Sequence, residues 1–102
     1  GLQGVAIGIL KLAVWVSRQG ELIKDIRIAL GPAGPVPLRA RETEAYLRGK
    51  IPGNETLEQA IQILLLETSF RTSPHRATAA YRQHLAGVLL KAAFFASWQR
   101  TS

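Results

Sequence analysis

The sequence contains no cysteine and no methionine. Without cysteine the chain can form neither a disulfide framework nor a thiolate metal site, so a disulfide-stapled secreted scaffold is excluded. A cytoplasmic location fits this composition best. Without methionine, Gly1 is not an initiator residue, and we expect the chain to be a fragment of a larger protein.

Long apolar runs are also absent. The opening run covers the twelve residues 5–16, and Lys11 interrupts it. A membrane-spanning helix needs roughly 20 apolar residues. A secretory signal would carry basic residues before its apolar segment, where this chain has none. We therefore expect neither a membrane helix nor a signal peptide.

Acidic residues are scarce, seven against thirteen basic ones, which gives a formal net charge of +6. Such a charge favours acidic partners through its long-range field. The arginines are scattered along every expected element and form no stripe that could follow a phosphate backbone. A solvated basic surface is therefore favoured over nucleic-acid binding. A free-standing basic module that binds acidic protein or nucleic acid stays as the alternative function.

The 102 residues, 47% hydrophobic and 20% charged, are typical of one globular domain with one core. Residues 5–16 are rich in β-branched and aromatic residues and predict a first strand. One face of it would present Ala6, Leu10, Leu12, Val14 and Val16, and the other Val5, Ile7, Ile9, Ala13 and Trp15 around Lys11. Because both faces are largely apolar, this strand must be covered on both sides or must face a partner.

A hairpin through residues 17–20 leads to a second strand over residues 22–30. Its alternation places Leu22, Lys24, Ile26, Ile28 and Leu30 on the core face, and Ile23, Asp25, Arg27 and Ala29 on the other. The three prolines among residues 31–37 predict a loop, with a short third strand around residues 36–38. The spacing of Gly31 and Gly34 could suggest a phosphate loop, but no strand-loop-helix with G-x-G-x-x-G or G-x-x-x-x-G-K-S/T follows, so a bare turn is favoured.

Three helices are expected after the strands. The first covers residues 40–48 and ends at Gly49 in a C-cap position. The second begins with a capping box at Thr56, or with Asn54 as its cap, and its stripe of Leu57, Ala60, Ile61, Leu64 and Leu65 is expected to pack on the sheet. The third begins at Ser73 and Pro74 and ends near Trp98. Its predicted stripe comprises Ala77, Tyr81, Leu85, Val88, Leu89, Ala92 and Phe95 or Ala96.

The order of elements, β-β-(β)-α-α-α, predicts an α+β domain, in which an antiparallel sheet of two to three strands carries three helices on one face. The residues predict no catalytic site. His75 and His84 are nine residues apart and would point in nearly opposite directions on a helix, so they cannot share a metal. Glu42 and Glu44 are interpreted as structural charges. No serine has the sequence context of a nucleophile elbow.

Three segments together resemble a known family. They are residues 26–31 (IRIALG), residues 36–44 (VPLRARETE) and residues 81–85 (YRQHL) with Leu89. In order and spacing they are similar to the C-terminal domain of the FAD-binding subunit of molybdenum hydroxylases, the group of carbon monoxide dehydrogenase, xanthine dehydrogenase and aldehyde oxidase.

The resemblance implies a domain that packs behind two preceding FAD-binding subdomains of the same subunit. In the parent oxidoreductase, FAD would pass electrons from iron-sulfur clusters to an acceptor. Molybdopterin and iron-sulfur subunits would be partners, and a homo-oligomer is left open. The fragment itself would hold no cofactor and would not be catalytic alone.

The resemblance carries few residues over to a site. The family's Gly-Gly-Asn type flavin loops have no counterpart here, and Gly4 stands where members often carry an aspartate. Arg39, Tyr81 and Arg82 match family positions, and we interpret them as pairing and packing residues. No catalytic, cofactor-binding or metal-binding residue is therefore assigned within residues 1–102.

Overall fold

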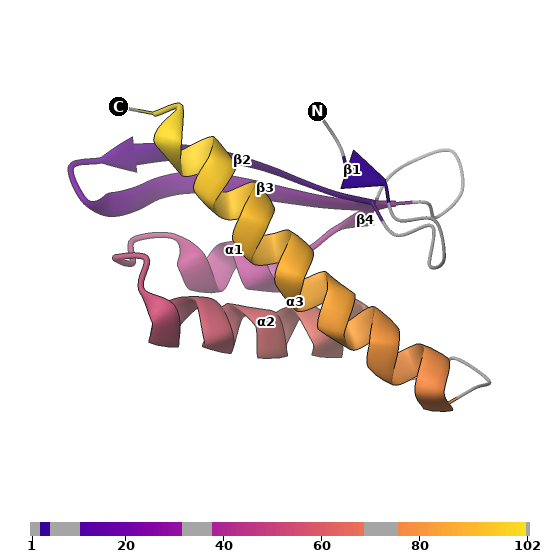
Figure 1. The fold of residues 1–102 in the computed structure, drawn as a ribbon. Helices are drawn as coiled ribbons and strands as arrows, with labels where there is room; N and C mark the ends of the chain where they lie inside the picture. The colour runs from indigo at the N-terminus through magenta and orange to yellow at the C-terminus, as the bar shows by residue number, and fades with distance from the viewer. Residues whose placement is uncertain (1–2, 5–10, 32–37, 69–75, 102) are drawn as a thin grey trace.

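The computed structural model describes residues 3–4, 11–31, 38–68 and 76–101. Its elements are β1 (Gln3–Gly4), β2 (Lys11–Gln19), β3 (Leu22–Gly31), β4 (Leu38–Arg39), α1 (Arg41–Leu47), α2 (Asn54–Thr68) and α3 (Arg76–Gln99). This order confirms the expected α+β fold, with an antiparallel sheet followed by three helices (Figure 1). The segment 5–10 of the predicted first strand, most of the predicted loop, and Ser73 and Pro74 lie outside the described residues.

The sheet has the strand order β1-β2-β3-β4, and every neighbouring pair is antiparallel. The long strands β2 and β3 form a hairpin that closes between Gln19 and Leu22. The predicted connection over residues 17–20 is therefore too long, because Ser17, Arg18 and Gln19 belong to β2. Gly20, with a φ of 60°, adopts the left-handed conformation that a two-residue hairpin turn requires. The pairing of β1 was not predicted.

A β-bulge changes which residues of β3 face the core. Ser17 pairs with Asp25, whereas Arg18 pairs with Ile23, so Lys24 is the extra residue. The bulge brings Ile23 to the same face as Ile26, and Ile23 is fully buried while Leu22 is exposed. The prediction of Leu22 on the core face and of Ile23 on the opposite face is therefore wrong. Simple alternation fails because the bulge shifts the register by one residue.

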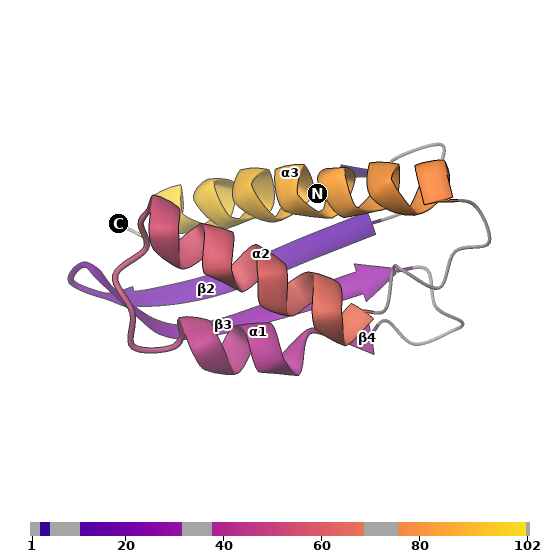
Figure 2. The same cartoon turned by 90° about the horizontal axis from the view of Figure 1, so that it is seen from below.

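Helices α1 and α2 lie on one side of the sheet, and α3 crosses the β2 edge of the sheet, so that its C-terminal end reaches beyond the strands (Figures 1 and 2). Helix α1 packs along β3, and α3 packs along β2. Helix α2 lies between α1 and α3, and its closest neighbours are these two helices. The sequence predicted that the α2 stripe packs directly on the sheet. In the structure α2 packs mainly against α1 and α3, and its stripe enters the core that these helices share with the sheet. Among the described helices, none has the length and apolar composition needed to cross a bilayer.

One core joins the sheet to all three helices. Its buried hydrophobic residues are Leu12, Val16, Ile23, Ile26, Ile28, Leu30, Ala40, Leu47, Leu57, Ala60, Ile61, Leu64, Ala86, Leu90 and Phe94. The predicted inner face of β2 is confirmed where it is described, since Leu12 and Val16 are buried and Val14 packs against the core. The stripe of α2 is confirmed as well, with Leu65 half-buried at its margin.

The start of α2 differs from both predicted caps. The amide of Leu57 donates to the carbonyl of Gly53 at 2.9 Å, which is the first bond of the helical ladder. Asn54 and Thr56 therefore already belong to the helix. The Thr56 hydroxyl donates backward to the carbonyl of Ile51. Helix α1 ends as predicted, because Gly49 follows it with a φ of 81°.

The residues of α3 that were predicted to face the core lie on a different side of the helix from the residues that are buried in the structure. Among the described side chains of α3, the fully buried hydrophobic residues are Ala86, Leu90 and Phe94, and the side chain of the predicted core residue Ala77 lies outside the described residues. The predicted core positions Tyr81, Val88 and Phe95 are exposed, and Leu85 and Leu89 are only half-buried. Helix α3 is apolar over most of its circumference, so periodicity alone permits both stripes. The position of the sheet decides between them.

Candidate functional site

A buried carboxylate joins β3, β4 and α1. Glu44, on α1, has a side chain that is 1% exposed. Its Oε2 accepts from the amide of Ile28 at 2.8 Å and from Nε of Arg39 at 2.8 Å, and its Oε1 accepts from Nη2 of Arg39 at 2.7 Å. Nη2 of Arg48 approaches Oε1 at 3.4 Å. The fork of Arg39 matches the two carboxylate oxygens, which is the geometry of a strong charge-assisted pair.

These contacts control the protonation of Glu44. Burial acts to raise the pKa of its carboxyl, because a charged group is costly to remove from water. The hydrogen bonds from Arg39 and from the Ile28 amide act in the opposite direction and prevail, so the pKa of Glu44 is lowered. Such a carboxylate is ionised at neutral pH and is not suited to act as a general base there. Its role is to hold three elements together.

The outer edge of β3 is closed by α1 and the segments around it. The amide of Ile28 donates to Glu44, and the carbonyl of Ile28 accepts from the Ala40 amide at 2.9 Å. At the other end of β3, Ile23 donates to the carbonyl of Lys50 and accepts from the amide of Gly49. A covered edge cannot pair with a further strand. Glu44 therefore also protects this edge of the sheet.

The edge of β2 is held by α3 in a similar way. The amide of Val16 donates to Oγ of the buried Ser97 at 3.0 Å. The Arg18 guanidinium lies 4.0 Å from the ring centroid of Trp98, so a cation-π contact joins the hairpin to the end of α3. These two contacts fix the C-terminal part of α3 against the sheet.

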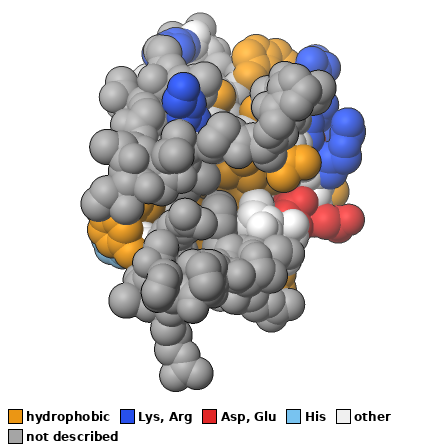
Figure 3. All heavy atoms as spheres, turned by 90° about the vertical axis from the view of Figure 1, so that its right-hand side faces the viewer, with side chains coloured by type: hydrophobic (Ala, Val, Ile, Leu, Met, Phe, Trp, Pro, Cys, Tyr) orange, Lys and Arg blue, Asp and Glu red, His pale blue; other side chains and the backbone are white. Residues whose placement is uncertain are grey.

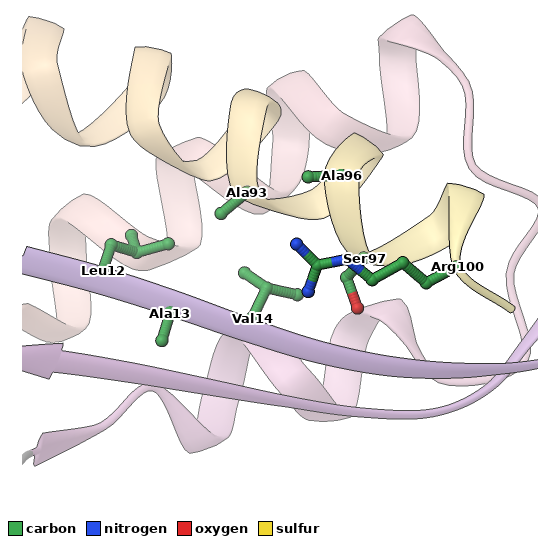
Figure 4. Close-up of a pocket in the computed structure, with 7 residues that line it drawn as sticks. All are labelled: Leu12, Ala13, Val14, Ala93, Ala96, Ser97 and Arg100. Atoms are coloured by element: carbon green, nitrogen blue, oxygen red, sulfur yellow. The ribbon is translucent and has the colours of Figure 1, made fainter. Parts of the chain in front are cut away.

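A small pocket opens between β2 and α3 next to Ser97 (Figure 4). It has a volume of about 230 Å³, and its lining consists of Leu12, Ala13, Val14, Ala93, Ala96, Ser97 and Arg100. Among the described residues of this lining, most side chains are aliphatic and Arg100 is the only ionisable one. The described part of the lining thus contains no acid-base pair and no nucleophile beside a base.

The outer face of the sheet carries Lys11, Ala13, Trp15 and Arg27. Trp15 is 50% exposed, and the Arg27 guanidinium lies 5.3 Å from its ring centroid. Among the described elements, α1 and α2 lie on the other side of the sheet, and α3 runs along its β2 edge (Figure 1). The described part of the predicted second face, Lys11, Ala13 and Trp15, is therefore confirmed as the face that does not enter the core. A half-exposed tryptophan on a sheet face is typical of an interface residue.

The residues that match family positions have different environments. Arg39 pairs with Glu44, as the pairing interpretation expects. Tyr81 is 43% exposed on α3 and does not pack into the core, so the packing interpretation is wrong for Tyr81. The side chain of Arg82 and all of His75 lie outside the described residues. His84 is exposed on α3, and within the described ranges no cluster of three metal-ligating side chains is found.

Fold and site define the class of protein: an α+β domain whose described buried polar groups form hydrogen bonds between its own elements. Residues 3–96 match the family described as the CO dehydrogenase flavoprotein C-terminal domain. The chain belongs to this family, which confirms the resemblance seen in its sequence. No curated protein is similar enough in sequence to count as a match.

Several solved structures share the fold. A carbon monoxide dehydrogenase from Hydrogenophaga pseudoflava, which lacks the Mo-pyranopterin moiety of its molybdenum cofactor, aligns with a TM-score of 0.74 and 25% identity over 100% of this chain and 37% of that one. Quinoline 2-oxidoreductase from Pseudomonas putida 86 aligns with a TM-score of 0.62 and 22% identity, covering 95% and 36% of the two chains. Reconstituted CO dehydrogenase from Oligotropha carboxidovorans gives 0.63 and 24%, covering 83% and 29%. This chain therefore spans about a third of the length of its structural neighbours.

Proposed function

We propose that this chain is the C-terminal module of the FAD-binding subunit of a molybdenum hydroxylase-type oxidoreductase, and that residues 1–102 form one domain of that larger subunit. The family match over residues 3–96 is the observation that supports this most directly. The short coverage of the structural neighbours is consistent with a missing larger part. The matches give no support to the alternative of a free-standing basic module.

The module has a scaffolding role in this proposal. Its buried charges pair with one another, so catalysis and cofactor binding are assigned to other parts of the enzyme. FAD would belong to the preceding part of the subunit. The molybdenum cofactor and the iron-sulfur clusters would belong to partner subunits in a cytoplasmic complex.

The outer sheet face is the surface that we assign to the flavin-binding part. It combines the exposed Trp15 with the small side chains of Ala13 and Ala29, so another domain can approach the sheet closely. Trp15 offers a large apolar area, which makes it the expected anchor of this contact. Lys11 and Arg27 border this surface and favour an acidic surface opposite.

Two measurements test the proposal. The reading frame upstream of Gly1 should encode a flavin-binding region, and a frame that begins here without such a region or neighbour would defeat the assignment. The isolated chain should be colourless and should bind no FAD in a calorimetric titration. A yellow preparation with tightly bound flavin would contradict the scaffolding role.

The contact surface is tested in the complete subunit. Trp15→Glu should increase the proteolytic release of the C-terminal module, because a charge replaces the apolar anchor. Leu38→Glu is the matched control, since Leu38 is 56% exposed on β4 and away from the proposed contact. Equal release from both variants would argue against the outer sheet face.

A further inference from the structure

The first turn of α1 has no cap from its own sequence. Ala40 occupies the position before the helix, and its methyl side chain cannot accept a hydrogen bond from the first helical amides. These amides also have no partner within the helix, so they need an acceptor from another element. A helix of only seven residues is unstable in isolation, because its nucleation is costly. The start of α1 therefore depends on contacts that other parts of the fold supply.

Glu67, near the C-terminal end of α2, supplies the missing acceptor. Helices α1 and α2 lie side by side (Figure 2). Oε1 of Glu67 accepts from the amide of Glu42 at 3.2 Å, and Oε2 accepts from the amide of Thr43 at 2.8 Å and from its hydroxyl at 2.5 Å. Glu42 and Thr43 are the second and third residues of α1, whose amides a side-chain cap normally binds. The negative charge of Glu67 is also favourable at this end of the helix.

The start of α1 also closes the outer edge of β3 at Ile28. Glu44 accepts from the Ile28 amide, and the amide of Ala40 donates to the Ile28 carbonyl. At the other end of β3, Ile23 is held by backbone bonds to residues 49–50, which lie beyond the end of α1. Opening of the first turn of α1 would therefore release the backbone of Ile28 and leave Ile23 bound.

We propose that Glu67 is a latch for the first turn of α1 and, through this turn, for the edge of β3 at Ile28. While the carboxylate holds the amides of Glu42 and Thr43, the turn stays helical and the edge is closed. Without these bonds the turn opens more often, which exposes the backbone of Ile28 while the rest of the domain stays folded. An exposed edge can pair with a further strand, so the latch decides whether this edge is available. The inference does not depend on the proposed function.

Amide hydrogen exchange of the complete 102-residue chain, followed residue by residue by NMR, tests the latch. The variant Glu67→Gln keeps the size of the side chain but removes its charge and replaces one acceptor oxygen with a donor. The Thr43 and Ile28 amides should then exchange at least about threefold faster, whereas the exchange of Ile23 should stay unchanged. Leu66→Ala is the matched control, since Leu66 is the neighbouring residue of α2 and is 62% exposed, and it should leave all three rates unchanged.

An unchanged exchange rate at Ile28 in Glu67→Gln would overturn the proposal. So would an equal acceleration at Ile28 and Ile23, because the variant would then lower the stability of the whole domain without a local opening. Thr43→Val is an independent check that also serves if Glu67→Gln does not fold, since it removes the hydroxyl contact at this buried position and keeps the backbone bond to Glu67. It should accelerate Ile28 by a smaller factor, again without a change at Ile23, and the same acceleration of both residues would contradict the latch.

Discussion

At the scale of single residues, the contribution of Glu44 to stability depends on two opposing effects: the cost of desolvating its carboxylate and the gain from its hydrogen bonds. Removing a carboxylate from water costs several kcal/mol, and each hydrogen bond to a charged group returns roughly 1.5 to 3 kcal/mol. Glu44 receives two bonds from Arg39 and one from Ile28, so the sum is favourable only while all of them are present. The lowered pKa of Glu44 is consistent with this balance.

We expect Glu44→Gln to destabilise the fold by about 2 kcal/mol, since it leaves Arg39 without its anionic partner. Arg39 is partly solvated, which keeps the loss below that of a fully buried pair. Glu42→Gln is the control, because Glu42 lies two residues before Glu44 but is exposed, and it should change stability by less than about 0.5 kcal/mol. Urea unfolding of the three proteins measures both values, and equal stabilities would refute the role of the junction.

The same residue predicts a dependence on pH. Folding lowers the pKa of Glu44 from its ordinary value of 4.5, so ionised Glu44 stabilises the fold above that pH. The contribution is lost as the pH falls through the lower pKa of the folded state. The free energy of unfolding should therefore decrease below about pH 4.5, and the decrease should be smaller in Glu44→Gln. Asp25, whose pKa Arg48 lowers by hydrogen bonding, leaves a residual dependence in that variant.

A third prediction concerns the edge of β2. Ser97→Ala should cost about 1 to 2 kcal/mol, because the amide of Val16 loses its acceptor at a buried position. Thermal unfolding measures the loss. The nearby Ala96→Ser, at an exposed position on the same turn, should leave the melting temperature nearly unchanged. A stable Ser97→Ala protein would show that water replaces the hydroxyl at this edge.

At the scale of the elements, the orientation of α3 can be tested by a pair of truncations. Leu90→Ala should cost about 2 to 5 kcal/mol, because Leu90 is fully buried and its removal leaves a cavity. Val88→Ala should change stability by less than about 0.5 kcal/mol, since Val88 is 48% exposed. The predicted stripe of α3 implies the reverse order of effects. Chemical denaturation of both variants therefore decides between the two orientations.

Helix α2 offers a corresponding test. Leu64→Ala should cost about 2 to 5 kcal/mol, because Leu64 is fully buried in the common core. Leu66→Ala, at a position that is 62% exposed two residues later, is the control and should be nearly neutral. A loss below about 0.5 kcal/mol for Leu64→Ala would contradict the placement of α2 between α1 and α3.

At the scale of the whole molecule, the domain presents two separate apolar surfaces. In our proposal the outer sheet face around Trp15 contacts the flavin-binding part of the subunit, and a second apolar row of exposed residues lies on α3. Lys11 and Arg27 border the outer sheet face and contribute to the positive net charge. In Figure 3 the Lys and Arg side chains in view lie in the upper part of this face, some at the left and a group along the right edge. The charge is thus interpreted as serving protein contacts.

The sequence alone determined the elements that rest on local chemistry. Alternation predicted the second strand, the stripe at Leu57, Ala60, Ile61 and Leu64 predicted α2, and Gly49 marked the end of α1. These features depend on the geometry of one strand or one helix, which a short stretch of residues specifies. The family resemblance could also be recognised from the sequence, because each of its three segments is a continuous stretch of residues.

Only the tertiary structure decided which of two apolar sides α3 buries, where the bulge falls in β3, and that Glu44 is a buried junction. Each depends on contacts between different elements: the burial of Leu90 on the position of the sheet, the bulge at Lys24 on the pairing of β3 with β2, and the role of Glu44 on the Ile28 amide. Arg39 and Arg48, five residues before and four after Glu44, were the available signal for that junction. A local pattern cannot reveal such features, because long-range packing and hydrogen bonding select among conformations that the sequence permits equally.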